Sequence, residues 1–265
     1  MATKMSKMNK SIVLRICKAD MTSYGGFIWP TKGYVEAPDW DAKEECRNGL
    51  FGWFEAQGYA NSSSYLNEPD ARYLVLEVET DSIIHIRLQG KCKFPRAKVC
   101  FVGNREEALA YIEEHCPHLQ DSPLLFASRK ANDCEIATAG DYGTAVAGKG
   151  GTAVSRYKGT SVAGRGGIAV SGFRGTSIAG DHGIAMVDEY GTAISGFRGT
   201  SIAGAYGAAM AGIKGMIHIE YFHGEGSRLA IGYIGIDGLK PDVKYVLDTD
   251  HTFVEEEIYK ELYRF

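Results

Sequence analysis

The sequence predicts a mainly β protein, built as a two-sided parallel β-solenoid of 16-residue coils with a small N-terminal α+β domain and a C-terminal β cap. Between residues 133 and 220 the chain repeats every eight residues, as in D-Y-G-T-A-V-A-G (141–148). Gly holds the third place of every octad from Gly143 to Gly215, and the next four places hold mainly small or β-branched residues. Such a run is typical of a short strand followed by a turn. These units must stack, because a single unit cannot bury its own face.

The full period is sixteen residues, because the turn residues alternate between two columns. One column, here called the aromatic column, consists of Tyr142, Tyr157, Phe173, Tyr190 and Tyr206. The other, here called the basic column, consists of Lys149, Arg165, His182, Arg198 and Lys214. One coil is therefore two strands and two turns, and coils stacked about 4.8 Å apart give a rod on the order of 26 Å long.

The pattern leaves two choices for the interior of the solenoid. Thr144 and Val146 share one side of their strand, and Ala145 and Ala147 share the other. Sheets packed about 10 Å apart need Val or Ile between them, so we expect the Val side to face inward. In the alternative, Ala and Ser fill a very thin interior and the Thr-x-Val side faces out.

The segments on either side of the repeats are not repetitive. Strand patterns occur at 11–17, 72–79, 82–88 and 98–102, and an amphipathic helix is expected at 105–115. After the repeats, further strand patterns predict a cap, which a solenoid needs because its last coil exposes a sheet edge. The expected organisation is a disordered tail (1–10), a small α+β domain (11–120), a connector (121–132), the β-solenoid (133–220) and the C-terminal cap (221–265).

Composition narrows the classes of partner and compartment. The 265 residues carry a net charge of −4 and no run of eighteen apolar residues, so we expect neither nucleic acid nor a membrane span. Residues 1–10 lack the apolar segment of a secretory signal, and the six cysteines form no Cys-x-x-Cys pair. We therefore expect free thiols and a cytoplasmic protein of a bacterium or a phage-infected host. The mixed spacing of His218, Glu220, His223 and Glu225 does not favour a metal site, and we expect no metal and no cofactor.

Two resemblances add to this interpretation. The octads resemble the A-G-Y-G-S-T-x-T repeats of bacterial ice-nucleation proteins, with a tyrosine beside the turn glycine, although Val, Ile or Met takes the second Thr place here. Nearly everything after residue 11 also resembles an uncharacterised family of bacterial and phage proteins with Gly-Thr-Ala octads. That resemblance implies an origin but no reaction, and it is carried by D-M-T-S-Y-G-G-F-I-W-P (20–30), V-E-A-P-D-W (35–40), Y-L-V-L-E-V (73–78), K-F-P-R-A-K-V (93–99) and G-I-D-G-L-K-P-D (235–242).

Three hypotheses for function follow. Phosphate-binding, nucleophile-elbow and zinc-protease motifs are absent from the sequence, so the first is a non-catalytic scaffold. In it, the solenoid self-associates through the aromatic column, with a dimer favoured. It presents its N-terminal domain to a bacterial or host protein such as a defence component, and the basic column binds an anionic partner or only keeps its edge soluble. The second is an enzyme with nucleotide-binding or ADP-ribosyl-transfer chemistry in residues 11–120. The third is an ice-binding protein, which requires the Thr column to face outward with Val146, Val162, Ile178 and Ile194.

Overall fold

The computed structural model describes residues 9–86, 90–236 and 238–262, and it divides into two compact units, residues 1–125 and 126–265. The predicted fold class is confirmed, because the protein is mainly β with a parallel solenoid of about six 16-residue coils and a small N-terminal domain. Residues 1–8 of the predicted tail lie outside the described residues, whereas Lys10 already belongs to the first strand.

The N-terminal unit contains one antiparallel seven-stranded sheet in the order β2-β7-β4-β1-β3-β6-β5. Single-turn 3-10 helices lie at Tyr24–Gly26, Ala60–Ser62, Thr80–Ser82 and Pro117–Leu119. The strands and the helix are β1 (Lys10–Cys17), β2 (Gly33–Glu36), β3 (Leu50–Phe54), β4 (Arg72–Glu79), β5 (Ile84–Ile86), β6 (Lys91–Phe94), β7 (Arg96–Gly103) and α1 (Arg105–His115).

Helix α1 occupies the predicted residues because both its start and its buried face are encoded locally. The side chain of Asn104 accepts a hydrogen bond from the backbone N–H of Glu107, and the Glu107 carboxylate accepts one from the Asn104 N–H. This capping box satisfies two backbone donors that would otherwise lack partners. Ala108 and Ile112, one turn apart, are fully buried where the helix packs on β4 and β7.

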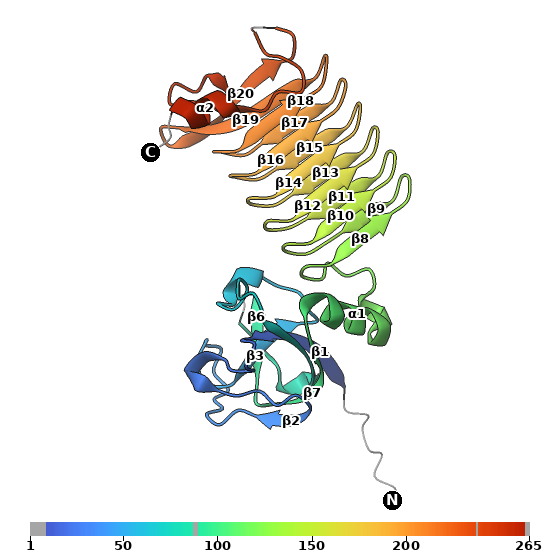
Figure 1. The fold of residues 1–265 in the computed structure, drawn as a ribbon, viewed down its shortest axis with the longest axis vertical. Coiled ribbons are helices and arrows are strands. Elements are labelled where there is room, and N and C mark those ends of the chain that lie inside the picture. Colours follow the sequence, from blue (N-terminus) through green and yellow to red (C-terminus); the bar gives the residue numbers. More distant parts are fainter. Residues whose placement is uncertain (1–8, 87–89, 237, 263–265) are drawn as a thin grey trace, which may run out of the picture. The chain divides into compact units, whose positions relative to one another are not determined.

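The second unit stacks its strands into two sheets, shown in green to red in Figure 1. The even sheet runs in the order β22-β21-β18-β16-β14-β12-β10-β8, and the odd sheet in the order β20-β19-β17-β15-β13-β11-β9. The even-numbered coil strands are β8 (Ser128–Ala131), β10 (Thr144–Ala147), β12 (Thr160–Ala163), β14 (Thr176–Ala179), β16 (Thr192–Ser195) and β18 (Ala208–Ala211). The odd-numbered ones are β9 (Ile136–Thr138), β11 (Thr152–Ser155), β13 (Ile168–Ser171), β15 (Ile184–Val187), β17 (Thr200–Ala203) and β19 (Met216–His223).

The solenoid begins earlier than the predicted residue 133, because β8 lies within the predicted connector and pairs in parallel with β10. At the other end the predicted cap forms from antiparallel strands. β20 (Gly226–Tyr233) pairs with β19, β21 (Tyr245–Leu247) with β18, and β22 (Phe253–Glu255) with β21. Helix α2 (Glu256–Leu262) follows β22.

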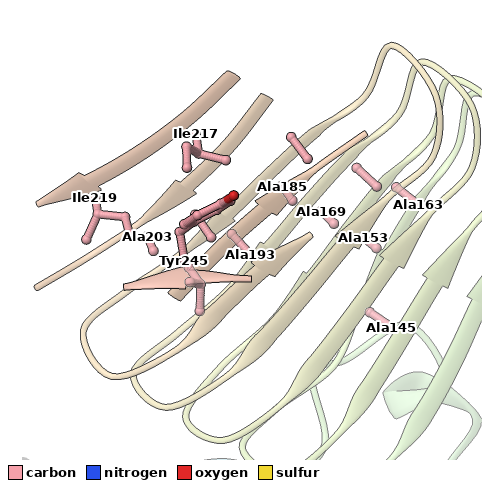
Figure 2. Close-up of a cluster of buried hydrophobic side chains, with 14 of the residues drawn as sticks. Ala145, Ala153, Ala163, Ala169, Ala185, Ala193, Ala203, Ile217, Ile219 and Tyr245 are labelled. Atoms are coloured by element: carbon pink, nitrogen blue, oxygen red, sulfur yellow. The ribbon is translucent and has the colours of Figure 1, made fainter. Parts of the chain in front are cut away.

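The interior of the solenoid holds Ala and Ser, so the expectation that Val faces inward is wrong. In most octads the fifth and seventh residues are buried and the fourth and sixth are at least partly exposed. Figure 2 shows the inward alanines, including Ala153, Ala169 and Ala185, following one another between the sheets. The reason is the short turn, which holds the two sheets close together. A Cβ added at the turn residue Gly167 would lie 2.9 Å from the Cβ of Ala163, so nearly all inward places from β9 to β18 hold Ala or Ser, and Val187 at the end of β15 is the exception.

The buried serines satisfy their hydroxyl groups inside this thin core. The Ser161 hydroxyl donates to the backbone oxygen of Val170 at 2.7 Å, across the interior. Ser171 donates to the backbone oxygen of Thr176 at 2.7 Å, and Ser155 lies 3.0 Å from Ser171 in the next coil. These bonds cross-link the two sheets, because a buried hydroxyl without a partner would destabilise the fold.

Each turn places the second residue of its octad in the left-handed region of backbone conformation. In the turn 140–143, the Gly143 N–H donates to the Gly140 oxygen at 3.1 Å and Tyr142 has a φ of 57°. This conformation costs a non-Gly residue about 1–2 kcal/mol. It also turns the Tyr142 N–H along the solenoid axis, where it donates to the Tyr157 oxygen of the next coil at 2.8 Å. The coil-to-coil bond offsets the strain and keeps the turn side chains in columns.

Candidate functional site

The outer surface of the even sheet carries a regular array of outward side chains, here called the threonine face. The parallel register pairs each coil with the next at equivalent positions, Thr144 with Thr160 and Val146 with Val162. Neighbouring coils lie about 4.8 Å apart, and residues two apart along a strand about 6.6 Å, so the side chains form a grid. The threonine face consists of Thr144, Thr160, Thr176 and Thr192 in one row and Val146, Val162, Ile178 and Ile194 in the other.

The hydroxyl groups of this face are available to water. All four threonines are partly exposed, and none of their hydroxyls makes a hydrogen bond to another described residue. Thr, Val and Ile are all β-branched and stiff at χ1, so each side chain holds its position beside an equivalent neighbour. The face is therefore a pre-ordered lattice of hydroxyl and methyl groups.

The outer surface of the odd sheet is less regular. Its fourth-place row mixes Ile168, Ile184 and Thr200, and its sixth-place row changes from Val170 to Met186 and Ile202. That row ends at His218, whose pKa is lowered by burial. Side chains of different length and polarity make this surface a poorer lattice than the threonine face.

The aromatic column forms one continuous edge of stacked rings. Its four successive centroid distances, from Tyr142 to Tyr206, are 5.7, 5.8, 5.4 and 5.0 Å. The column also extends one coil further in each direction, to Phe126 at 6.0 Å from Tyr142 and to Phe222 at 6.3 Å from Tyr206. Sequence reasoning missed these two residues, although each lies sixteen positions from a predicted member.

Two cations lie over the rings of the aromatic column. The Lys158 Nζ is 5.4 Å from the Tyr142 ring centroid and 5.6 Å from that of Tyr157. The Arg174 Cζ is 5.5 Å from the Phe173 centroid and 5.4 Å from that of Tyr190. Each cation thus bridges two coils, in contacts that stabilise by about 0.5–1 kcal/mol at exposed sites. The sequence signal for them was a basic residue directly after the aromatic one.

The basic column lies along the other line of turns, and all five members are exposed. Backbone hydrogen bonds join its coils, such as Gly150 N–H to the Arg165 oxygen at 2.9 Å. Two acids stand in the same column: the Asp133 carboxylate accepts from the Lys149 N–H at 2.7 Å, and that of Asp181 from the Phe197 N–H at 2.9 Å. These acids divide the positive charge. An anionic partner for this column stays a prediction.

The structure gives little support to the other candidate sites. Among the described residues, no three His, Cys, Asp or Glu side chains come together to hold a metal, and no helix could span a membrane. In the N-terminal unit, a cavity beside Arg15, Trp53 and Lys91 has a volume of about 20 Å³. That volume suits a single water, whereas small-molecule sites measure about 300 Å³ or more, so this cavity does not support the nucleotide hypothesis.

The sequence has relatives among ice nucleation proteins. It is 37% identical over 123 residues to ice nucleation protein InaU of Pantoea ananas, and the matched segment makes up 44% of this chain and 12% of that protein. It is 40% identical over 111 residues to an ice nucleation protein of Xanthomonas campestris pv. translucens, covering 42% of this chain and 7% of that protein. For an ice nucleation protein of Pseudomonas syringae the identity is 39% over 106 residues, 40% of this chain and 9% of the relative. No protein-family model and no solved structure matches the chain.

These relatives confirm the resemblance predicted from the octads, and they correct the first functional hypothesis. The scaffold of phage or bacterial origin that presents a recognition domain to a host defence protein is contradicted, because the homologues are ice nucleation proteins. The finding favours the third hypothesis. The chain spans only about a tenth of the length of these relatives, as the 12% and 7% figures show.

Proposed function

We propose that the protein binds ice through the threonine face. One observation carries the proposal: a solenoid whose repeats are similar to those of ice nucleation proteins presents an outward lattice of Thr and Val or Ile in strict register. Hydroxyl groups that are not bonded within the protein can join an ordered water layer, and the methyl groups between them keep that layer in place. A rigid lattice loses little conformational entropy when it binds a solid surface.

The test is to measure thermal hysteresis and inhibition of ice recrystallisation with matched face variants. Thr160→Lys combined with Thr176→Lys places two long charged side chains in the middle of the threonine face, and we expect hysteresis to be lost. The control is Thr152→Lys combined with Thr200→Lys, which changes equivalent places on the odd sheet. Hysteresis should persist in the control. A wild-type protein without hysteresis or affinity for ice crystals would rule the proposal out, and equal loss in both variants would remove the assignment to this face.

We also propose that two copies associate antiparallel along the aromatic column. Tyr190 and Tyr206 are 47% and 69% exposed, which leaves ring surface for a partner. A two-fold axis at the coil of Phe173 would bring Tyr157 and Lys158 of one copy opposite Tyr190 and Glu189 of the other. Lys158 of each copy then faces Glu189 of the other, whereas Arg174 lies at the axis, where it packs over the rings of Phe173 and Tyr190 of its own copy.

The symmetry of this pairing has a consequence for ice binding. An antiparallel pairing edge to edge needs a two-fold axis along the normal of the sheets. This axis leaves the threonine faces of both copies on the same side, so the dimer has a lattice of twice the width. The proposed dimer therefore enlarges the proposed ice-binding surface.

A further inference from the structure

The aromatic column changes its chemistry at the C-terminal end of the solenoid. Lys158 and Arg174 cover the rings from Tyr142 to Tyr190, as described above. In the coil of Tyr206 the neighbouring residue is Ala205, which has no charge. No Lys or Arg among the described residues lies over Tyr206, Tyr221 or Phe222.

A pocket of about 360 Å³ opens at this place. It is lined on one side by the end of the column and by β19, and on the other by the segment after β21 and by helix α2. Five aromatic side chains contribute to its lining: Tyr206, Tyr221, Phe222, Tyr259 and His251, whose ring stacks on that of Tyr221 with centroids 4.1 Å apart. The volume lies in the range of small-molecule sites.

The carboxylates of the pocket are Glu220 and Asp248, and its one titratable base among the described lining residues is His251. Glu220 makes no ion pair with a described residue. The Asp248 carboxylate accepts hydrogen bonds from the N–H groups of Asp250 and Thr252, both at 2.9 Å, and these bonds lower its pKa. Asp248 is therefore ionised at neutral pH and held in one position.

The lysines closest in sequence to the pocket are engaged elsewhere. Lys240 pairs with Glu255 at 2.8 Å. Lys244 and Lys260 pair with Glu256 at 3.3 and 3.1 Å. The pocket thus combines aromatic faces and carboxylates, without a cation from these side chains.

We propose that this pocket binds a small organic cation of the quaternary ammonium or guanidinium type. Aromatic rings attract such cations through the negative faces of their π systems, and a carboxylate at the rim adds Coulomb attraction. The column already holds a lysine and an arginine in this manner, so the chain itself shows the geometry two coils away. The inference does not depend on ice binding.

The experiment is a titration of the full chain with tetramethylammonium chloride and, separately, with tert-butanol, followed by NMR or calorimetry. Tert-butanol has a similar shape but no charge. We expect saturable binding of the cation that shifts the signals of Tyr206 and Tyr221, and much weaker binding of the alcohol. Equal affinity for both, or no saturable binding of the cation, would overturn the proposal.

Matched variants locate the site. Tyr206→Leu should weaken cation binding by roughly 2- to 30-fold, the range for one cation–π contact. Glu220→Gln should weaken it by up to about fivefold. The controls are Tyr157→Leu, which removes a ring of the same column, and Glu225→Gln in the turn after β19. If Tyr157→Leu weakened binding as much as Tyr206→Leu, the cation would bind along the open column and the pocket assignment would be wrong.

Discussion

Replacement of an interior alanine tests the arrangement on which the threonine face depends. Ala169 is 0% exposed, lies between Ala153 and Ala185 in the adjacent coils, and alternates with the outward Val170 (Figure 2). Ala169→Leu forces three additional carbon atoms into a layer where its inward neighbours in the adjacent coils, Ala153 and Ala185, are also alanines. Overpacking of this kind costs about 1–3 kcal/mol.

The matched variant is Val170→Ala, one residue along the same strand. Val170 is partly exposed, so loss of its two methyl groups should lower the free energy of unfolding by about 0.8 kcal/mol, half of the value for two buried methyl groups. A loss of 2 kcal/mol lowers the unfolding temperature of a unit of this size by roughly 4–8 °C. Ala169→Leu should therefore shift the transition clearly further than Val170→Ala.

Circular dichroism and fluorescence separate the two units in this assay. Trp29, Trp40 and Trp53 all belong to the N-terminal unit, so tryptophan fluorescence follows that unit alone and should be unchanged in both variants. Circular dichroism reports the strands of both units, so a transition seen by circular dichroism and not by tryptophan fluorescence belongs to the solenoid. If Val170→Ala destabilised more than Ala169→Leu, the valines would face inward, and the assignment of the threonine face would be refuted.

Two further predictions concern association and pH. Glu189→Lys should dissociate the proposed antiparallel dimer, and Lys158→Glu combined with Glu189→Lys should restore it. Light scattering measures the mass of each variant, and a monomeric wild type would exclude the dimer. Burial lowers the pKa of His218 below its ordinary 6.5, so near this pH the unfolded chain binds more protons than the folded one. The free energy of unfolding is therefore highest above pH 6.5 and falls as the pH drops through the folded-state pKa. His218→Gln should flatten this slope between pH 7 and 5 in urea unfolding, and a slope equal to that of wild type would contradict the assignment.

Local signals decided how far the sequence could predict the fold. The capping residues Asn104 and Glu107 and the buried Ala108 and Ile112 are all within one segment, so α1 was predicted with its observed bounds. The two columns were predictable because the 16-residue period stacks the turn Asp141-Tyr142 on the turn Tyr157-Lys158, so that their aromatic rings become neighbours. The interior was not, because alternation identifies two sides of a strand but gives no distance between sheets. That distance follows from the turn, where Gly167 packs against Ala163.

Other features needed contacts that no repeat encodes. Strand β8 was missed because Ala127 replaces the turn Gly and Arg129 and Lys130 replace the small or β-branched residues of an octad, so its assignment depends on pairing with β10. The C-terminal pocket joins Tyr206 to Asp248 and Tyr259, which are 42 and 53 residues away and follow no period. The resemblance of the octads, in contrast, was local, and it predicted the relatives that were found.

The composition of the threonine face itself bears on the proposed ice binding. Thr and Val have the same branched shape, so Val146 and Val162 preserve the flatness and spacing of the lattice at the place where the A-G-Y-G-S-T-x-T repeat that the octads resemble carries a second Thr. They do not preserve its hydrogen bonding, because each strand keeps one outward hydroxyl instead of two. A short array with half the hydroxyl anchors orders less water than a long one. It can still adsorb to a surface whose water is already ordered, so the function proposed above for a single copy is the binding of existing ice and not the initiation of freezing.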